Sequence, residues 1–417
     1  MKVIHDSVHG SIRLSDEFAE LLSTPELQRL SGIRQLGLGY LVFPGANHTR
    51  LEHSLGTYHI AGLISDAIGL DVQSKKEVMA AAMLHDIGHG PFSHTLEVSF
   101  KMMNGKDHMD ITQALIKGET ELNIEGVEIE KRVPDVLESM GIEPEAVASL
   151  VKDVRESHYW PGPDIGDVKA SIIHGPIDAD QLDYLMRDAH YTGVAHGTID
   201  IERLMQTIMV RENRLVIDRS GVTAAEGILV ARALMYSSVY FHRTVRIAEM
   251  MLNKGVMDMD IEPERIQMMN DCSLIEGMKN MGGFPRKMAL SITYRRLYKK
   301  ALSLELSALE PEEKRKLAEW SGRTHELEKE IARRAGIDER EVLVDIPGRD
   351  ILISEPRMNE TEVIVWDGKN LNPLSRYSTL PKALRRRNVH RWGVLVASPE
   401  QYIKKVEKAA KYTIFSP

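Results

Sequence analysis

The sequence predicts a mainly α-helical fold with small β-hairpins and a small α+β domain at its carboxyl end. Apolar residues recur at a spacing of three to four through most of the chain up to about residue 335, which is the period of helices with one packed face. Short runs of β-branched residues near positions 2–14 and 214–218 predict strands. After residue 335 such runs recur, and this change of period predicts the α+β domain.

The chain opens with a predicted hairpin, whose strands at 2–6 and 11–14 are separated by a turn at His9-Gly10. Helices follow, and several of them begin at a Ser, Thr or Asp residue that can cap the first turn. The predicted helical ranges are 15–22, 25–33, 49–68, 75–87, 108–117, 134–137, 144–154 and 176–187. A strand at 214–218 precedes a long helix from Thr223 to about Leu252, and the chain stays helical to about residue 305.

The last part of the chain begins with a highly charged helix from Glu310 to about Arg334. Strands are predicted at 342–346, 362–366 and 392–396, and a final helix at 399–410. We therefore expect three parts, which are a core at 1–255, a helical extension at 256–335 and a small α+β domain at 336–417.

Composition limits the classes of protein to consider. An apolar fraction of 43% and a charged fraction of 27% are near globular averages, which disfavours disordered and collagen-like chains. The net charge of -8 predicts that the molecule as a whole does not attract nucleic acid or anionic membranes. A single cysteine, Cys272, disfavours a disulfide framework and agrees with a reducing compartment. We expect a cytoplasmic protein without a signal peptide or membrane span.

Histidines are concentrated early in the chain, at positions 48, 53, 59, 85, 89, 94 and 108. The segment 80–91 predicts an alanine-rich helix that ends at glycine and proline. The adjacent pair His85-Asp86 lies at the end of this helix. Imidazole and carboxylate together suit divalent cations such as Zn, Mn, Fe or Mg. A His-Asp pair alone is weak support, because the chain has another at His5-Asp6 for which no metal is predicted.

A second polar cluster follows at Asp180, Tyr184 and Asp188, which recur every four residues and therefore share one helical face. A solvated charged face is the alternative reading. Leu182 and Leu185 indicate that the same helix is partly buried, which favours a functional face.

Ordered matches along the chain show a resemblance to a known family. They are His5–Gly10, Thr24–Leu30, Gln35–Gly37, Phe43–Arg50, the segment around His53, His85–His94 and the helix around Asp180. By these motifs the chain resembles the HD-domain deoxynucleoside triphosphate triphosphohydrolases, including the SAM-and-HD-domain type. The resemblance runs from the first residues to about residue 255, which makes 1–255 an expected HD phosphohydrolase core, and it includes no SAM domain.

The resemblance implies one divalent metal ion, Mn, Mg, Fe, Co, Ni or Zn, held by four ligands. These ligands would be His53, His85, Asp86 and Asp180. Open coordination positions would take water and a phosphate oxygen, so that hydrolysis at the α-phosphate releases triphosphate and a deoxynucleoside. Arg50 would hold phosphate oxygens.

The same resemblance assigns the other site residues. His89, His94 and His108 match the family's catalytic histidines, and His94 is the first choice for the acid that protonates the departing 5′ oxygen. Glu97 would orient His94, although close relatives carry aspartate there. The predicted substrate contacts are Gln35, Tyr184 and Asp188 on the sugar, Leu36 on the base, and Arg243 or Arg246 toward the triphosphate.

Two departures from the family pattern bear on ligands. Gln181 stands where the SAM-and-HD-domain relatives have a lysine that contacts triphosphate, so another cation or a different substrate is expected. An effector nucleotide is a further candidate partner. Lys2, Val3 and Gln28 match the relatives' effector site, but Ser23 and Ser31 replace an aspartate and an arginine, so activation by that route is not expected.

Several readings stay open. The leading prediction is hydrolysis of dGTP or other dNTPs by a homo-oligomer, a dimer or tetramer. Alternatives are an HD phosphohydrolase acting on another nucleotide, and a regulator that binds metal and nucleotide. Basic runs at 286–300 and 385–391 are solvated faces, nucleic-acid or nucleotide contacts, or interfaces between subunits.

Overall fold

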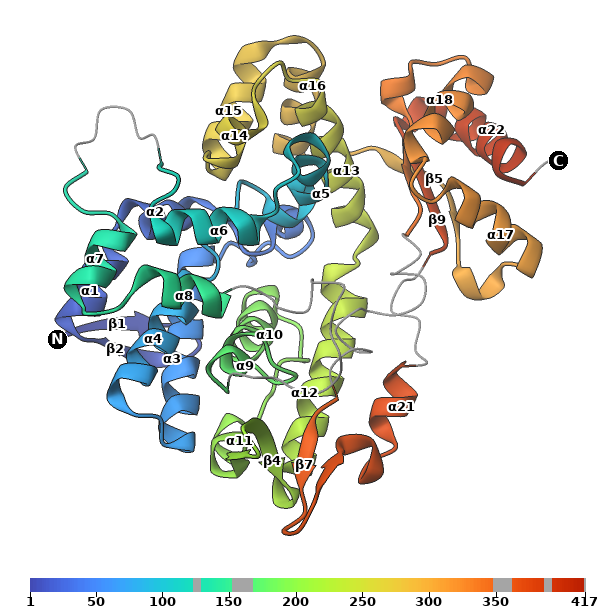
Figure 1. Ribbon diagram of the computed structural model, residues 1–417. Helices are drawn as coiled ribbons and strands as arrows, with labels where there is room; N and C mark the ends of the chain where they lie inside the picture. The colour runs from blue at the N-terminus through green and yellow to red at the C-terminus, as the bar shows by residue number, and fades with distance from the viewer. Residues whose placement is uncertain (123–128, 152–167, 348–361, 386–391, 416–417) are drawn as a thin grey trace. The chain divides into compact units, whose positions relative to one another are not determined.

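The structure is a computed structural model that describes residues 1–122, 129–151, 168–347, 362–385 and 392–415 (Figure 1). Within these ranges it leaves undescribed the side chains of residues 94, 98, 101–104 and 385. The chain divides into two compact units. The first unit comprises Met1–Met235, Ile261–Leu274 and Thr361–Leu384, and the second comprises Tyr236–Asp260, Ile275–Glu360 and Arg385–Pro417.

The first unit opens with the predicted hairpin. Strands β1 (Lys2–Asp6) and β2 (Gly10–Leu14) pair antiparallel, with Val3 opposite Arg13. Gly10 has a φ of +72°, which a residue with a side chain rarely adopts, and it allows the turn to close here. The hairpin prediction is confirmed.

Helices make up most of the first unit, and their bounds follow in chain order. They are α1 (Asp16–Leu22), α2 (Pro25–Arg29), α3 (Arg50–Ile68), α4 (Val72–Leu84), α5 (Ser93–Asn104), α6 (His108–Lys117), α7 (Val133–Ser139), α8 (Pro144–Val151), α9 (Val168–His174), α10 (Ala179–Thr192), α11 (Ile201–Thr207), α12 (Val222–Met235) and α14 (Pro263–Gln267). Helix α3 packs against both α4 and α10, and this central group of helices carries the polar clusters singled out in the sequence (Figure 1).

Two predicted helices end earlier than expected. Helix α2 passes at Leu30 into a 3-10 turn, so the range 25–33 is not one α-helix. Helix α4 ends at Leu84, and His85 is its C-terminal cap residue. The helix cannot continue far beyond this point because Gly88 and Pro91 follow. Helix α5 was not predicted.

A four-stranded sheet completes the first unit, with the order β3 (Ile208–Arg211), β4 (Arg214–Asp218), β7 (Ile364–Trp366) and β8 (Leu371–Pro373). Strands β3 and β4 form a hairpin whose turn residues, Glu212 and Asn213, both have positive φ. Strand β7 pairs parallel to β4. The strand expected at 362–366 therefore belongs to a sheet of the first unit, and α21 (Leu380–Arg385) follows it in the chain. The three-part division by residue number stays a prediction.

The second unit combines helices with a three-stranded sheet. Its elements are α13 (Arg243–Met257), α16 (Gly283–Thr293), β5 (Lys299–Leu304), α17 (Pro311–Trp320), α18 (Thr324–Ala335), β6 (Leu343–Asp345), β9 (Val394–Ser398) and α22 (Ile403–Phe415), while α15 (Asp271–Met281) runs from the first unit into the second. The sheet order is β5-β9-β6, and both pairings are antiparallel.

Three helix predictions in this part of the chain are wrong. The long helix predicted from Thr223 breaks at a π-helical turn, Tyr236–Tyr240, and α13 restarts with His242 as its own cap. Residues 299–304 form β5, because the buried strand β9 needs a hydrogen-bonding partner on each side. The charged helix predicted at 310–334 is two helices, α17 and α18, separated at Gly322, where φ is +86°.

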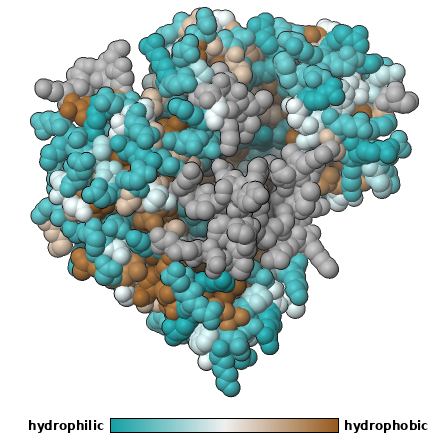
Figure 2. All heavy atoms as spheres, viewed as in Figure 1, coloured by the Kyte–Doolittle hydropathy of each residue, from teal (hydrophilic) through white to brown (hydrophobic). Residues whose placement is uncertain are grey.

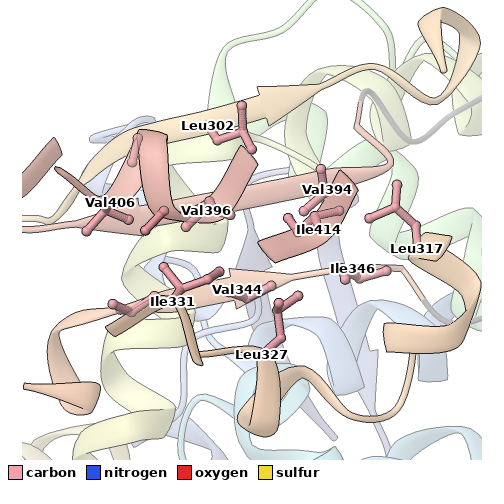
Figure 3. Close-up of a cluster of buried hydrophobic side chains, with 14 of the residues drawn as sticks. Leu302, Leu317, Leu327, Ile331, Val344, Ile346, Val394, Val396, Val406 and Ile414 are labelled. Carbon is pink, nitrogen blue, oxygen red and sulfur yellow. The ribbon is translucent and has the colours of Figure 1, made fainter. Parts of the chain in front are cut away.

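The core of the second unit lies where α18 and α22 pack against the sheet (Figure 3). Leu327 and Ile331 of α18 are fully buried there, together with Val394 and Val396 of β9. The alternation of Val394 and Val396 places both side chains on one face of the sheet, as the period of a strand requires.

Among the described residues, the stretch Arg219–Tyr240 is long and apolar enough to meet the length and composition criterion for a membrane helix. A core helix of a globular domain meets the same criterion, and 44% of the apolar window is buried, so this is weak support for a span. Hydrophilic side chains cover most of the described surface in the view of Figure 2.

We expect Leu327→Ala to destabilise the protein by about 2–5 kcal/mol, because it leaves a cavity in the core of the second unit. The measurement is urea denaturation followed by circular dichroism. Lys329→Ala, an exposed position on the same helix, is the control and should change the free energy of unfolding by less than about 0.5 kcal/mol. Equal stability of the two variants would contradict the packing described here.

Candidate metal centre and active site

Helix α3 presents two polar side chains from its first turns. Its N-terminal cap, Thr49, forms a reciprocal capping box with Glu52, in which each side chain accepts a hydrogen bond from the other residue's backbone N–H. This cap fixes the start of the helix, so Arg50 and His53 project from a rigid turn. Both are about 1% exposed.

The segment after α4 carries the His-Asp pair. Gly88 lies so close to α6 that a Cβ would be 2.3 Å from the carbonyl oxygen of His108. Arg29 donates from one Nη2 atom to the carbonyl oxygens of Ile87 (2.7 Å) and His89 (2.8 Å), which holds the segment from the other side. The turn that positions His85 and Asp86 is therefore fixed by backbone contacts.

Helix α10 supplies the remaining acidic residues. Asp178 caps it by accepting a hydrogen bond from the backbone N–H of Gln181, at 2.7 Å. Asp180 lies in its first turn, and Asp183 and Asp188 follow on later turns. Asp180 and Asp183 thus face His53 of α3 across a direct helix–helix contact.

Three predicted ligands come together. One ligand atom each from His53, His85 and Asp180 lies within 4.8 Å of the others. Nε2 of His53 is 3.0 Å from Oδ1 of Asp180, and Nε2 of His85 is 3.8 Å from the same oxygen. The buried Nε2 of His85 makes no hydrogen bond. A divalent cation would satisfy this nitrogen, so the group fits the predicted metal.

Asp86 lies beside this trio. Its Oδ1 is 3.3 Å from Nε2 of His85, and its Oδ2 is 3.9 Å from Nε2 of His53. Oδ2 also accepts a hydrogen bond of 2.5 Å from Arg50. Burial opposes ionisation of Asp86, but His85, Arg50 and His89 hold its pKa well below the usual range. Asp86 is therefore an anionic neighbour that can serve as the fourth ligand.

His53 is oriented by a residue that the sequence analysis did not assign. Its Nδ1 is 2.7 Å from Oδ2 of Asp183, a carboxylate with no exposed surface. If Nδ1 carries the proton, Nε2 presents its lone pair to a metal, which is the usual arrangement of metal-binding histidines. Burial lowers the pKa of His53, yet Asp180 and Asp183 together raise it to about 10 in the metal-free protein. The signal for Asp183 was its position three residues after Asp180, on the same face.

A cavity adjoins the cluster. Its lining comes from the turn after α4, from α5, from the start of α6 with the residues just before it, and from the end of α14. It consists of His89, Gly90, Ser93, Glu97, Phe100, Lys106, Asp107, His108 and Gln267. Ser93 accepts a hydrogen bond of 2.8 Å from Nε of Arg50. The cavity therefore brings the predicted catalytic residues to the same place as the guanidinium that contacts Asp86.

Two of the predicted catalytic histidines stack in this cavity. The rings of His89 and His108 lie 4.0 Å apart at 10°. Burial, Arg50 and His108 lower the pKa of His89 well below its usual range. Burial also acts to lower the pKa of His108, but its hydrogen bond to Glu97 raises it overall. Glu97 thus pairs with His108. The side chain of His94, which it was expected to orient, lies outside the described residues.

Two of the predicted sugar contacts, Gln35 and Asp188, form hydrogen bonds with His48, a residue to which the sequence analysis assigned no role. Nε2 of His48 is 2.7 Å from Oδ1 of Asp188, and the backbone N–H of Gln35 donates to the carbonyl oxygen of His48. The oxygen and nitrogen of a buried glutamine amide, Oε1 and Nε2, need hydrogen-bond partners, and Oε1 of Gln35 has none in the structure. A ligand hydroxyl can donate to this oxygen. Leu36 and Tyr184 flank these residues in sequence and are partly exposed.

Helix α13 carries Arg243 and Arg246, the residues predicted to contact the triphosphate. Arg243 and Arg246 lie in the second unit. Within that unit, Arg246 donates to Asp345 at 2.9 Å and also pairs with Glu249. Its guanidinium therefore has carboxylate partners already, and the contribution of Arg243 stays a prediction.

Comparisons with known proteins identify the family. Residues 50–188 match the family model described as HD domain, and residues 199–415 match the model described as HD associated region. The chain belongs to the HD-domain phosphohydrolase family, which confirms the predicted family and the mainly α-helical fold. The first match includes His53, His85, Asp86 and Asp180.

Similar proteins span much of the chain. The uncharacterized protein MJ1154 of Methanocaldococcus jannaschii is 31% identical over 98% of this chain and 81% of its own length. The human deoxynucleoside triphosphate triphosphohydrolase SAMHD1 is 29% identical, over 62% of this chain but only 45% of its own. A solved structure of a hypothetical protein from Aquifex aeolicus superposes with a TM-score of 0.72 at 27% identity, covering 98% of this chain and 99% of that one.

We expect Asp180→Ala to weaken Mn²⁺ binding by more than about 100-fold, beyond the effect typical of residues that only support a ligand. Fold stability should change by less than about 1 kcal/mol, because the side chain is not fully buried. Isothermal titration calorimetry measures the affinity. His190→Ala, an exposed histidine at the end of the same helix, is the control and should bind as the wild type does. Unchanged binding in Asp180→Ala would remove this residue from the ligand set.

Proposed function

We propose that the chain hydrolyses deoxynucleoside triphosphates, dGTP or other dNTPs, to deoxynucleoside and triphosphate with one divalent metal ion. The observation that carries the proposal is the trio His53, His85 and Asp180 beside a cavity lined by His89 and His108. A metal trio next to groups that transfer protons is what phosphate ester hydrolysis requires. The named activity of the human relative supports the choice of substrate.

His53, His85, Asp180 and Asp86 would hold the ion, whose identity among Mn, Mg, Fe, Co, Ni and Zn stays open. When bound, it would polarise a phosphate oxygen and make a water molecule more acidic. Hydrogen bonds to Asp86 and Ser93 fix Arg50, so its guanidinium charge is preorganised for a phosphate oxygen. A fixed guanidinium stabilises developing charge without having to reorganise.

Proton transfer falls to the histidines of the cavity. Glu97 holds His108 and favours its protonated form, so His108 can supply a proton to a departing oxygen. His89 has a lowered pKa and is neutral at pH 7, which suits a hydrogen-bond acceptor or a base. His94 remains the first choice for the acid by family resemblance, and His108 with Glu97 is the alternative that the described side chains favour.

Sugar recognition is proposed for Gln35 and Asp188. The unpartnered Oε1 of Gln35 and the carboxylate of Asp188 are both acceptors, and a 3′ hydroxyl could donate to either. Tyr184 would exclude a 2′ hydroxyl and Leu36 would contact the base. A site built on buried acceptors discriminates strongly against ligands that leave them unpaired.

The proposal extends to the oligomeric state, the cellular location and the effector of the protein. We propose a homo-oligomer, a dimer or tetramer, that works in the cytoplasm. Ser23 and Ser31 replace an aspartate and an arginine of the relatives' effector site, so an effector nucleotide would need different contacts. Gln181 is buried and uncharged, and another nucleotide substrate is the alternative that this replacement favours.

The test is a screen of all dNTPs and NTPs with Mn²⁺, Mg²⁺, Co²⁺ and Ni²⁺, with products separated by ion-exchange chromatography. We expect triphosphate and deoxynucleoside in equal amounts, at a rate that Asp180→Ala abolishes. His94→Ala should retain nucleotide binding and lose turnover by about 100-fold or more. Release of orthophosphate or pyrophosphate would indicate another phosphohydrolase. Binding without any product would indicate a regulator.

Lys106 is a candidate for the cation that Gln181 does not provide, since it lines the cavity beside His89 and His108. We expect Lys106→Ala to raise KM for the nucleotide roughly 5- to 20-fold with little change in kcat, because the charge binds ground state and transition state alike. The effect should shrink at high salt. Lys117→Ala, at the end of α6 and not among the residues that line the cavity, is the control. A fall in kcat at constant KM would contradict this role.

A further inference from the structure

The N-terminal hairpin reaches the metal cluster through the loop between its two strands. Oδ1 of Asp6 accepts hydrogen bonds from the backbone N–H groups of Val8 (2.9 Å) and His9 (2.8 Å), which fixes the loop. The hairpin lies outside residues 50–188, the part that matches the HD domain model. The carboxylate of Asp6 therefore holds the hairpin loop through contacts within the hairpin itself.

Two side chains of the loop join the group around Asp183. Nε2 of His9 is 2.6 Å from Oδ1 of Asp183, and these side chains are 6% and 0% exposed. Oδ2 of Asp6 accepts a hydrogen bond of 2.8 Å from Nη1 of Arg187. Arg187 in turn donates to both oxygens of Asp183, at 2.9 Å each. The hairpin therefore contacts Asp183 directly through His9 and indirectly through Arg187.

Asp183 has partners on both oxygens. Oδ1 is held by His9 and Arg187, and Oδ2 by Arg187 and Nδ1 of His53. Gly56 of α3 leaves the room for this arrangement, since a Cβ there would be 1.8 Å from Oδ1 of Asp183. A carboxylate with so many fixed donors has one available orientation, and that orientation decides which nitrogen of His53 carries the proton.

We propose that the hairpin is a positioning element of the metal centre, in which His9 and Asp6 hold Asp183 so that it orients His53 with Nε2 toward the metal. The inference rests on the proposed metal-dependent function. A purely structural ion network is the competing account. The two differ because a structural network affects folding alone, whereas a positioning network also changes metal affinity in the folded protein.

The main test replaces His9 and measures Mn²⁺ affinity by calorimetry on full-length protein that circular dichroism shows to be folded. His9→Phe keeps a ring beside His59, whose centroid is 5.3 Å away, but removes the donor to Asp183. We expect its Kd for Mn²⁺ to rise roughly 10- to 100-fold. His9→Gln restores an N–H donor and should recover most of the affinity. His5→Phe, at an exposed position on the same hairpin, should bind as the wild type does.

A second variant perturbs Asp183 without removing a polar group. Gly56→Ala places a methyl group against Asp183 and should also weaken Mn²⁺ binding at least tenfold. Gly227→Ala is its control, because a Cβ there has nothing within 4 Å. If either His9→Phe or Gly56→Ala is folded and binds Mn²⁺ within threefold of the wild type, the inference is overturned. It is also overturned if both fail to fold, since the contact then serves stability alone.

The outcomes separate the inference from the proposed function. A wild-type chain that takes up none of Mn²⁺, Mg²⁺, Fe²⁺, Co²⁺, Ni²⁺ and Zn²⁺ removes the metal centre and, with it, both proposals. A wild type that binds Mn²⁺ and a folded His9→Phe that binds equally well remove only the role of the hairpin. A loss of Mn²⁺ affinity in His9→Phe that is recovered in His9→Gln supports the hairpin as a positioning element.

Discussion

The structure of the first unit depends on the burial of several carboxylates at one place, where α3, α10 and the turn after α4 meet. Carboxylates that share a buried region repel one another and lose their hydration, so the arrangement persists only if cations offset both costs. Arg50 contacts Asp86, and Arg187 contacts Asp183. The rest of the site is arranged around these two buried ion pairs.

The charges of these aspartates and of their two arginine partners do not cancel. Asp6, Asp86, Asp180 and Asp183 carry four negative charges when ionised, and the two guanidiniums carry two positive ones. With neutral imidazoles, two negative charges remain, which is the charge that one divalent ion neutralises. The carboxylates of Asp180 and Asp183 raise the pKa of His53 to about 10, so a divalent ion bound at its Nε2 would compete with a proton for the same atom.

Close backbone approach makes this dense polar cluster geometrically feasible. At Gly56 and Gly88 any side chain would collide with the facing helix, and each glycine lies next to a group that the site needs. Gly56 accommodates Asp183, and Gly88 accommodates the start of α6, which carries His108. These glycines therefore serve the spacing of helices, and neither has a positive φ.

The local features of the site could be predicted from the sequence. A His-Asp pair after an alanine-rich helix, and the polar residues Asp180, Tyr184 and Asp188 at a spacing of four on another helix, are short-range patterns that can be recognised in the sequence. The contacts of His9 with Asp183, and the parallel pairing of β7 with β4, join segments far apart in the chain, and no local period encodes them. The strand β5 was missed for the same reason, because its pairing with β9 overrides a helix-compatible pattern.

The aspartates of this region have different hydrogen-bond partners, and these partners determine what each carboxylate can do. Asp183 is surrounded by donors from the protein, so it has no capacity left for a ligand and can only orient its neighbours. Asp180 faces two imidazoles and is the most exposed of the cluster, which leaves it able to bind an ion. Asp86 lies between this trio and Arg50, so it would link the proposed metal to the proposed phosphate-binding cation. Asp188, on a later turn of the same helix as Asp180, is oriented by the imidazole of His48. Four aspartates on two segments thus differ in function because of the cations and donors that folding brings to them.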